Sequence, residues 1–274
     1  MSMRVTASIV IFKNDPVVLE RAIRSYLRDE PDGTLYLIDN SPRPTEEEFI
    51  HHPRVVYRFN GRNVGFGKGH NLALSLSLQQ GADYHIVLNP DIYFDAGVVP
   101  GLTALMDKHP EIGLAMPKVF YPNGQLQNLC KLLPTPRLLF VRHFLRFSPA
   151  ILKKENHEYE LRFSGYDRLM DVPFLSGCFM FLRNEALKKV GLFDERIFLY
   201  TEDIDLTRRI HRHFRTVFFP DVSIYHVHER GSYKNFRSFL HHIRSAITYF
   251  NKWGWFHDPE RDVINRNTLL RLSR

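Results

Sequence analysis

The sequence predicts an α/β fold in which a mostly parallel sheet is flanked by helices. Four short apolar runs bounded by turn residues are typical of strands, and they occupy residues 5–12, 34–39, 54–59 and 84–89. Residues 17–27 and 71–78 carry apolar side chains at helical spacing between these runs. Strands that alternate with helices favour a parallel sheet. Three of the runs end in polar residues, so a ligand is expected at the carboxyl edge of the sheet.

The composition is that of a folded protein that needs no disulfide or metal to hold it together. The chain has 274 residues, 44% of them hydrophobic and 24% charged, which excludes a disordered chain, a collagen and a coiled coil. Cys130 and Cys178 lie in apolar neighbourhoods and have no CxxC partner, which fits a reducing compartment. The formal net charge of +7 favours an anionic partner such as a nucleotide, a phospholipid or a nucleic acid.

We expect a cytoplasmic protein without a membrane span. No stretch reaches the roughly 18 to 20 apolar residues that a span needs. The apolar run nearest to the first residue covers only residues 7–12, which is too short for the core of a signal peptide. Basic side chains are spread among 30 acidic residues and no nucleic-acid motif occurs, so no nucleic-acid partner is expected.

Two segments of the second half leave alternatives open. Residues 131–156 contain an apolar run at 138–147 interrupted by basic residues, which fits either a buried helix or a helix in a membrane interface. Residues 234–253 form an amphipathic helix that can pack on the protein, contact a membrane or mediate a homodimer. Its apolar positions are Phe236, Phe239, Leu240, Ile243, Ile247 and Phe250, and its polar positions are Arg237, His241, Arg244 and Ser245.

Two motifs offer ligands for a hard metal ion. Asp91 belongs to Asn89-Pro90-Asp91, directly after an apolar strand, where a carboxylate suits Mg²⁺ or Mn²⁺ bridging phosphates. The same tripeptide is also a common turn sequence. Alternation places His226 and His228 on one face of a strand, without a third His or Cys at zinc spacing. These histidines are therefore either structural residues or, with Asp91, part of a hard-metal site.

An acidic cluster opens the predicted helix that follows residues 198–200. Thr201 is expected to cap this helix, and Glu202, Asp203 and Asp205 crowd its first turn. The cluster fits either a well-capped amphipathic helix or a general base beside the apolar FLY segment. Arg208 and Arg209 can meet a diphosphate or neutralise the acids of the cluster.

Residues 63–71 form a glycine-rich loop that opens a helix. Such a loop lets the backbone approach a ligand and presents helix N-terminal amides to an anion. The segment lacks the Gly-Lys-Ser/Thr ending of a P-loop, and its spacing is not that of the dinucleotide fingerprint.

Together these motifs resemble the family 2 inverting glycosyltransferases, and most closely the bacterial rhamnosyltransferase-like enzymes that build O-antigen and other surface polysaccharides. The resemblance covers residues 5–232, and its most specific part is the block 177–209. The segments that carry it are VTASIVIFKND, LIDNS, NVGFGKGHN, LNPDI, FLSGCFMFLRNEALKKVGLFDERIFLYTEDIDLTRRI and YHVHERGS.

The resemblance implies a GT-A fold, in which a Rossmann-like nucleotide-sugar half is joined to an acceptor half. By residue number, these halves are 1–120 and 121–232, and 233–274 is a C-terminal helical extension. The base and ribose of the donor are expected against residues 9–12, Asp39 and Asn63. The full set of expected donor contacts is Ile11, Phe12, Asp39, Asn63, Gly65, Lys68, Asn89, Arg208 and Arg209.

The resemblance also assigns the catalytic and metal-binding roles. Asp203 corresponds to the catalytic base, Asp91 to the metal-binding acid of the DxD motif, and His226 to a further metal ligand. Asn89 replaces the first acid of DxD, so it is expected to contact metal or phosphate through water. The acceptor is expected against Gly177, Phe179, Phe198, Tyr200 and Glu202, where the aromatic rings stack on a sugar or, for at least one of them, pack in the core.

The implied activity is inverting transfer of a sugar from a nucleotide-sugar to a saccharide acceptor linked to polyprenyl diphosphate. By resemblance the donor is dTDP-L-rhamnose and the metal is Mg²⁺ or Mn²⁺. UDP-hexose, UDP-hexosamine and UDP-galactofuranose are alternative donors, and a nucleotidyltransferase or sugar-nucleotide hydrolase is an alternative activity. The expected location is the cytoplasmic face of a bacterial inner membrane, where basic residues can meet anionic lipid.

Overall fold

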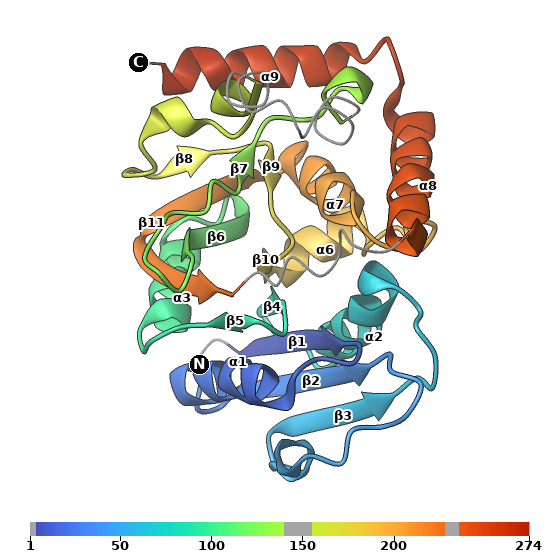
Figure 1. The fold of residues 1–274 in the computed structure, drawn as a ribbon. Helices are drawn as coiled ribbons and strands as arrows, with labels where there is room; N and C mark the ends of the chain where they lie inside the picture. Colours follow the sequence, from blue (N-terminus) through green and yellow to red (C-terminus); the bar gives the residue numbers. More distant parts are fainter. Residues whose placement is uncertain (1–3, 140–154, 228–235, 274) are drawn as a thin grey trace.

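The computed structural model describes residues 4–139, 155–227 and 236–273, and it contains one large sheet flanked by helices (Figure 1). The strands of the large sheet follow the order β3-β2-β1-β4-β10-β6-β11-β5, with β8 paired to β11, and β7 pairs with β9 in a separate small sheet. The strands are β1 (Val5–Ile11), β2 (Thr34–Asp39), β3 (Val55–Phe59), β4 (Tyr84–Leu88), β5 (Ile92–Tyr93), β6 (Ile112–Phe120), β7 (Cys130–Lys131), β8 (Met170–Asp171), β9 (Phe174–Leu175), β10 (Phe179–Arg183) and β11 (Arg215–His226). The helices are α1 (Pro16–Asp29), η1 (Glu48–His51), α2 (Phe66–Gln79), α3 (Val98–Lys108), η2 (Arg162–Ser164), α6 (Asn184–Val190), α7 (Glu202–His211), α8 (Phe236–Trp253) and α9 (Pro259–Leu272).

The sheet is mostly parallel, as predicted. β3, β2, β1, β4, β6 and β11 run in one direction, because β10 lies antiparallel between β4 and β6. The four predicted runs are β1 to β4, and they differ from the predicted ranges by at most one residue at an end. The antiparallel β10 comes from the second half of the chain, so it carries the residues before it to the carboxyl edge of β4.

Helices cover both faces of the sheet. Successive residues of β4 point to opposite faces, so Ile86 belongs to the core under α1 and α3, and Val87 to the core under α2, α6 and α7. Side chains of α1 and α3 in the first core include Leu19, Ile23, Val99 and Leu102, and side chains of the other helices in the second core include Leu74, Leu187 and Leu206. The result is a three-layer arrangement with the sheet in the middle (Figure 1).

The glycine-rich segment is helical rather than a loop, which corrects the sequence-based boundary of α2. Gly65 precedes the helix, whereas Gly67 and Gly69 lie within its first two turns. A Cβ at Gly67 would lie 2.9 Å from the Cβ of Phe193, and one at Gly69 would lie 2.8 Å from Cγ2 of Val10. These glycines therefore allow close packing of α2 against its neighbours.

The C-terminal helices pack on the second half of the molecule, where Tyr249 and Phe250 of α8 contact Leu133, Phe174 and Ile204. The helix predicted at 234–253 is confirmed as α8, and its buried face differs from the predicted one. The predicted polar residue Ser245 is 2% exposed, and the predicted apolar residues Ile243 and Ile247 are 38% and 41% exposed. The cause is that Ser245 makes hydrogen bonds to Leu199 and Thr201, in a loop that α8 faces.

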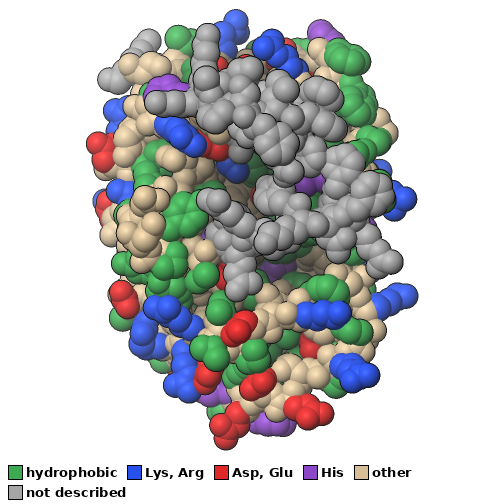
Figure 2. Space-filling model, viewed as in Figure 1, with side chains coloured by type: hydrophobic (Ala, Val, Ile, Leu, Met, Phe, Trp, Pro, Cys, Tyr) green, Lys and Arg blue, Asp and Glu red, His purple; other side chains and the backbone are tan. Residues whose placement is uncertain are grey.

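Most of the apolar run at 138–147, together with His228 and the side chains of Phe236, Arg237 and Phe239, lies outside the described residues. Among the helices that the structure describes, none combines the length and the apolar character required to cross a bilayer. Both cysteines are buried and unpaired with each other. On the face shown in Figure 2, Lys and Arg side chains are interspersed with Asp and Glu, as the sequence indicates.

A buried polar network lies between β1, β4 and α2. Ser8 Oγ lies 2.7 Å from His70 Nδ1 and 2.8 Å from His85 Nε2, and Thr6 Oγ1 lies 2.8 Å from His85 Nδ1. Burial lowers the pKa of His85 to about 3 and holds the pKa of His70 well below its usual value of 6.5. Both imidazoles are therefore neutral at physiological pH, and this network joins the strands to the helix without a buried charge.

We expect these histidines to destabilise the protein in mild acid. The unfolded chain binds protons at histidine below about pH 6.5 whereas the folded protein does not, so stability is lost as the pH falls below that value. Urea denaturation measures the free energy of unfolding of the wild type and of His85→Gln. Between pH 6 and 5 this free energy is expected to fall more steeply in the wild type, by about 1.4 kcal/mol per pH unit.

The matched control is Ser8→Ala, which removes a hydrogen-bond partner of both histidines but leaves the histidines in place. This variant is expected to be less stable at every pH and to keep the wild-type slope. Equal slopes for wild type and His85→Gln would show that His85 takes up a proton in the folded protein.

Candidate active site

Four segments that are distant in the sequence meet at the carboxyl edge of β4. The backbone N–H of Asn89 donates to the Cys178 carbonyl at 2.9 Å, and that of Val227 donates to the Asp91 carbonyl at 3.1 Å. The N–H of Gly177 donates to Asp203 Oδ2 at 2.9 Å. The structure thus brings together the ends of β4 and β11, the start of β10 and the first turn of α7.

Asp91 and His226 form a pair at this edge. His226 Nε2 lies 3.3 Å from Asp91 Oδ1, and His226 Nδ1 lies 3.0 Å from the amide oxygen of Gln127. Because an amide oxygen only accepts, Nδ1 carries the proton, and in the neutral imidazole the lone pair of Nε2 faces Asp91. Gln127 also donates to the His226 carbonyl at 2.8 Å, so it fixes both ends of this residue.

This pair fits a divalent metal ion. Two neighbouring ligands of an octahedral ion with bonds of about 2.1 Å lie about 3 Å apart, close to the observed separation. In the described parts of the chain, no group of three or more His, Cys, Asp or Glu side chains is arranged to hold a metal. The further ligands of an ion bound here would therefore be water and phosphate oxygens, which is usual for Mg²⁺.

The Asn-Pro-Asp segment is also a turn, because the N–H of Ile92 donates to the Asn89 carbonyl at 3.3 Å. Both sequence-based interpretations thus apply to the same tripeptide. The turn places Asp91 toward β11, where His226 lies. Asn89 occupies the first position after β4, beside the backbone of Cys178.

Asp203 lies at the start of α7 in a narrow space. Its Oδ2 accepts the Gly177 hydrogen bond, and its Oδ1 accepts from the N–H of Ile204 at 2.9 Å. A Cβ at Gly177 would lie 2.9 Å from the Cβ of Asp203, so this contact requires glycine. Burial raises the pKa of Asp203, and the Gly177 amide and the positive charge of Lys131 oppose that rise. A raised pKa brings an aspartate closer to the range in which it accepts a proton at neutral pH.

Glu202 differs from its neighbour Asp203 in its surroundings. Its side chain is buried, and Oε2 has no hydrogen-bond partner among the described residues. Burial, with the adjacent charge of Asp203, holds the pKa of Glu202 well above its usual value. The two neighbouring carboxyl groups are therefore distinct, with the protonated form favoured at Glu202.

The turn before these acids has a strained backbone. Tyr200 and Thr201 have φ angles of 69° and 60°, in the left-handed region that residues other than glycine rarely adopt. Each such residue costs on the order of 1–3 kcal/mol, and such strain clusters at active sites. Thr201 precedes the helix as predicted, but its hydroxyl does not cap it, because Oγ1 donates instead to the Ser245 carbonyl at 3.2 Å.

The residues expected to contact an acceptor divide into two groups. Phe198 and Tyr200 are half-buried, and their rings stack on His241 and His242 of α8. Phe179 is 0% exposed and packs against Phe94 in the core, so of the two roles expected for these aromatic residues it has core packing and not sugar stacking. Its place on the central strand β10 explains its burial.

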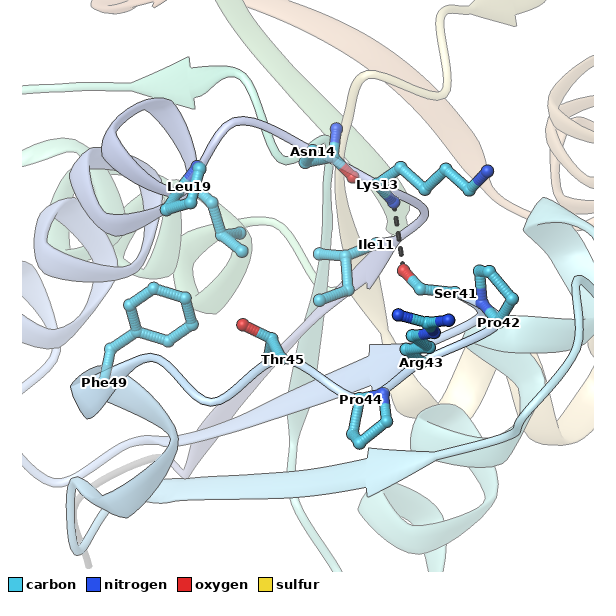
Figure 3. A pocket seen from close by; sticks show the side chains of 11 residues that line it. Ile11, Lys13, Asn14, Leu19, Ser41, Pro42, Arg43, Pro44, Thr45 and Phe49 are labelled. Atoms are coloured by element: carbon cyan, nitrogen blue, oxygen red, sulfur yellow. Dashed lines mark hydrogen bonds between the residues drawn. The ribbon is translucent and has the colours of Figure 1, made fainter.

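A cavity of about 400 Å³ opens at the carboxyl ends of β1 and β2 (Figure 3). Ile11, which the sequence predicts at the donor, lines it together with Leu19 and Phe49, and Lys13 and Arg43 supply its positive charges. The complete lining is Ile11, Lys13, Asn14, Pro16, Leu19, Ser41, Pro42, Arg43, Pro44, Thr45 and Phe49. Phe12, the adjacent predicted residue, is exposed beside this lining.

Asp39 holds the 41–45 loop that lines this cavity. Its carboxylate accepts hydrogen bonds from the N–H of Ser41 at 2.8 Å, the N–H of Thr45 at 3.2 Å and the hydroxyl of Tyr57 at 2.7 Å. The side chain is fully buried, so in this structure Asp39 shapes the 41–45 loop and does not line the cavity.

The predicted donor residues at the start of α2 contact the loop that leads to the acidic cluster. Asn63 Oδ1 accepts from the Gly65 N–H at 2.9 Å, and Lys68 pairs with Glu195 at 2.7 Å. The N–H of Phe66 donates to the Phe198 carbonyl at 3.0 Å. Gly65 has a φ of 93°, and any side chain here would collide with that carbonyl.

The expectation that Arg208 and Arg209 reach a diphosphate is not met in the structure. Arg208 is 1% exposed and donates two hydrogen bonds of 2.7 Å to Asp258, at the start of α9. Arg209 pairs with Asp205 at 2.9 Å and donates to backbone carbonyls of residues 190–192. The alternative of neutralising an acid of the cluster therefore describes Arg209, whereas Arg208 holds the C-terminal helix.

Comparison with known proteins identifies the class to which this fold and site belong. Residues 4–244 match the sequence model of the family described as Glycosyltransferase like family 2. The chain therefore belongs to this family, as its motifs predict.

The sequence is similar to the N-acetylglucosaminyl-diphospho-decaprenol L-rhamnosyltransferase of Mycobacterium tuberculosis, with 26% identity over 273 residues, 92% of this chain and 87% of the relative. The fold is similar to that of S. aureus TarS, with a TM-score of 0.60 and 14% identity over 98% of this chain. It is also similar to GalNAc-T7 in complex with UDP, GalNAc and Mn²⁺, with a TM-score of 0.58 and 15% identity over 82% of this chain. The chain spans 43% of each of these two solved chains, which share its GT-A fold.

Proposed function

We propose that this family 2 glycosyltransferase is an inverting enzyme that transfers a sugar to a saccharide carried on a polyprenyl diphosphate. The observation that carries the proposal is Asp203, a partly buried carboxylate held by Gly177 at the same edge of the sheet as Asp91 and His226. L-Rhamnose from dTDP-L-rhamnose is the favoured donor, because the mycobacterial relative is named as a rhamnosyltransferase that acts on a decaprenol-linked sugar. The product would serve in O-antigen or other surface polysaccharide synthesis.

In the proposed reaction Asp203 acts as the general base. It takes the proton of an acceptor hydroxyl while that oxygen attacks the anomeric carbon from the face opposite the nucleoside diphosphate. The bond from the anomeric carbon to the diphosphate breaks, and its electron pair leaves with the diphosphate. One base is sufficient for such a displacement, which inverts the anomeric configuration and forms no covalent intermediate with the protein.

Asp91 and His226 are the residues proposed to hold Mg²⁺ or Mn²⁺. When bound, the ion would offset the negative charge that develops on the departing diphosphate. Gln127 keeps the Nε2 lone pair of His226 directed at Asp91, as the orientation of a metal-binding imidazole requires. We propose that Asn89 contacts the metal or phosphate through water.

The nucleoside of the donor is proposed to occupy the cavity at the ends of β1 and β2. The cavity volume of about 400 Å³ is in the range of small-molecule sites, and its lining combines apolar side chains with Lys13 and Arg43. UDP-linked hexose, hexosamine and galactofuranose are the alternative donors, since GalNAc-T7, which shares the fold, binds UDP.

We further propose that the protein docks peripherally on the anionic cytoplasmic face of the bacterial inner membrane. Leu240, Ile243 and Ile247 lie on one exposed face of α8, and Phe256, just beyond the helix, is 93% exposed. Exposed apolar side chains of this size mark interaction surfaces. Arg244 lies exposed beside this face, and each basic residue near an anionic surface contributes about 1 kcal/mol to binding.

Loss of the base is the test of the transferase mechanism. Asp203→Asn is expected to lower sugar transfer by roughly two to four powers of ten, because the amide cannot accept the proton. Binding of the nucleotide, measured by calorimetry, is expected to stay at the wild-type level. Asp221→Asn, on an exposed part of β11, is the matched control. Transfer by Asp203→Asn at the wild-type rate would exclude Asp203 as the base.

The donor and metal proposals predict a stabilisation that needs both ligands. The melting temperature is expected to rise with dTDP or UDP plus Mn²⁺ or Mg²⁺, and to return to that of the free protein with EDTA. A ligand at a hundred times its Kd adds about 2.7 kcal/mol to the free energy of unfolding. His226→Leu is expected to abolish the metal-dependent part. Equal stabilisation by GDP and ADP would contradict a thymidine or uridine donor.

Vesicle co-sedimentation tests the membrane proposal. We expect the protein to sediment with vesicles that contain phosphatidylglycerol at low salt, and the triple variant Ile243→Ser, Ile247→Ser, Phe256→Ser to bind at least about tenfold more weakly. Val56→Ser, which changes an exposed apolar residue on the distant strand β3, is the matched control. Absence of binding to anionic vesicles would exclude docking, and a dimer abolished by the triple variant would assign this face to a second copy of the chain.

A further inference from the structure

Helix α8 contacts the strained turn on both sides of Tyr200. The Ser245 hydroxyl donates to the Leu199 carbonyl at 2.7 Å, and the Ser245 carbonyl accepts from Thr201 Oγ1 at 3.2 Å. A single buried residue of α8 thus binds the positions before and after Tyr200. Ser245 therefore binds one backbone carbonyl and one side-chain hydroxyl of the turn.

Aromatic stacking adds to these hydrogen bonds. The rings of Tyr200 and His242 are 3.8 Å apart between centroids, with 15° between their planes, and the rings of Phe198 and His241 are 4.3 Å apart with 22° between their planes. Near-parallel rings at this separation restrict rotation of both side chains. The aromatic residues of the turn are therefore fixed against α8.

The same helix also contacts α7 beyond the turn. Trp253 Nε1 donates to Asp205 Oδ1 at 2.8 Å, and Lys252 Nζ lies 2.7 Å from the same oxygen. Asp205 is one turn or less from Asp203. The contacts of α8 therefore extend from residue 198 to the first turn of α7.

These contacts meet a clear energetic requirement. Two successive left-handed residues are costly, and such a conformation persists only where its surroundings enforce it. A relaxed turn would redirect the first turn of α7, and with it the carboxylate of Asp203. The space at Asp203 is narrow, because Gly177 is in direct contact with it.

We propose that Ser245 is a positioning residue for the general base: it enforces the left-handed turn at Tyr200 and Thr201 and thereby sets the direction of the Asp203 carboxylate. This inference rests on the proposed function, because it assigns Asp203 the role of base. It adds α8 to the machinery of the acceptor half, whereas the sequence places Ser245 on a solvent-facing side of the helix.

The test separates positioning from simple support of the fold. Ser245→Ala is expected to lower kcat by about ten- to a hundredfold, the size of effect that a shift of about 1 Å in a catalytic group produces, with KM for the donor unchanged. Addition of Thr201→Gly is expected to restore most of the lost kcat, since glycine adopts the left-handed conformation without strain. Thr248→Ala is the matched control, because the Thr248 hydroxyl donates only within α8, to the Arg244 carbonyl at 2.9 Å.

Two results would overturn the proposal. One is a Ser245→Ala variant with wild-type kcat. The other is a Ser245→Ala variant whose lost kcat follows its lost thermal stability and is not restored by Thr201→Gly, which would indicate structural support alone. Asp203→Asn is measured in parallel to distinguish failure of the proposed function from failure of the Ser245 proposal. Full activity of Asp203→Asn would show that Asp203 is not the base.

Discussion

The hydrogen bond between the Asn89 N–H and the Cys178 carbonyl joins the end of β4 to the start of β10, and the rest of the candidate site depends on it. It exists because β10 lies antiparallel beside β4, so that β10 begins where β4 ends. Gly177, the next residue toward the N-terminus, then reaches Asp203 with its N–H. A shift in the register of β10 would separate Asp91 and His226 from Asp203.

The site also separates charges that would otherwise oppose one another. Glu202 and Asp203 are adjacent carboxyl groups, and the Asp203 carboxylate accepts backbone N–H donors from Gly177 and Ile204. Glu202 lies in a buried environment that favours its neutral form. In that form Glu202 does not repel the neighbouring Asp203 carboxylate.

The sequence predicts the parts of this architecture that depend on local pattern. The strands β1 to β4, the helix α1 and the acidic start of α7 follow from apolar periodicity and turn residues, and the ordered motifs predict the family. Contacts made across the fold have no local signal. Gln127 lies in no motif although it orients His226, and Arg208 is buried against acids at the start of α9. Ser245 is buried because it makes hydrogen bonds to Leu199 and Thr201, and the periodicity of its own helix does not indicate these contacts. Asp39 lies at the end of β2, as the predicted run 34–39 indicates, but its buried hydrogen bonds depend on a loop that the sequence does not position.

The pairing of Arg208 with Asp258 makes the stability of the fold depend on residues beyond the family match. The match to the family model ends at residue 244, within α8. Asp258, which pairs with Arg208, lies at the start of α9, and Lys252, which pairs with Asp205, lies at the end of α8. Removal of one partner from a buried ion pair costs about 3–5 kcal/mol, a large part of the 5–15 kcal/mol that keeps a typical domain folded. The family match therefore ends before the residues that pair with Arg208 and Asp205. A protein shortened to residues 4–244 would lose Asp258, the counter-charge of the buried Arg208. A relative with a different C-terminal segment has to supply that charge from another residue.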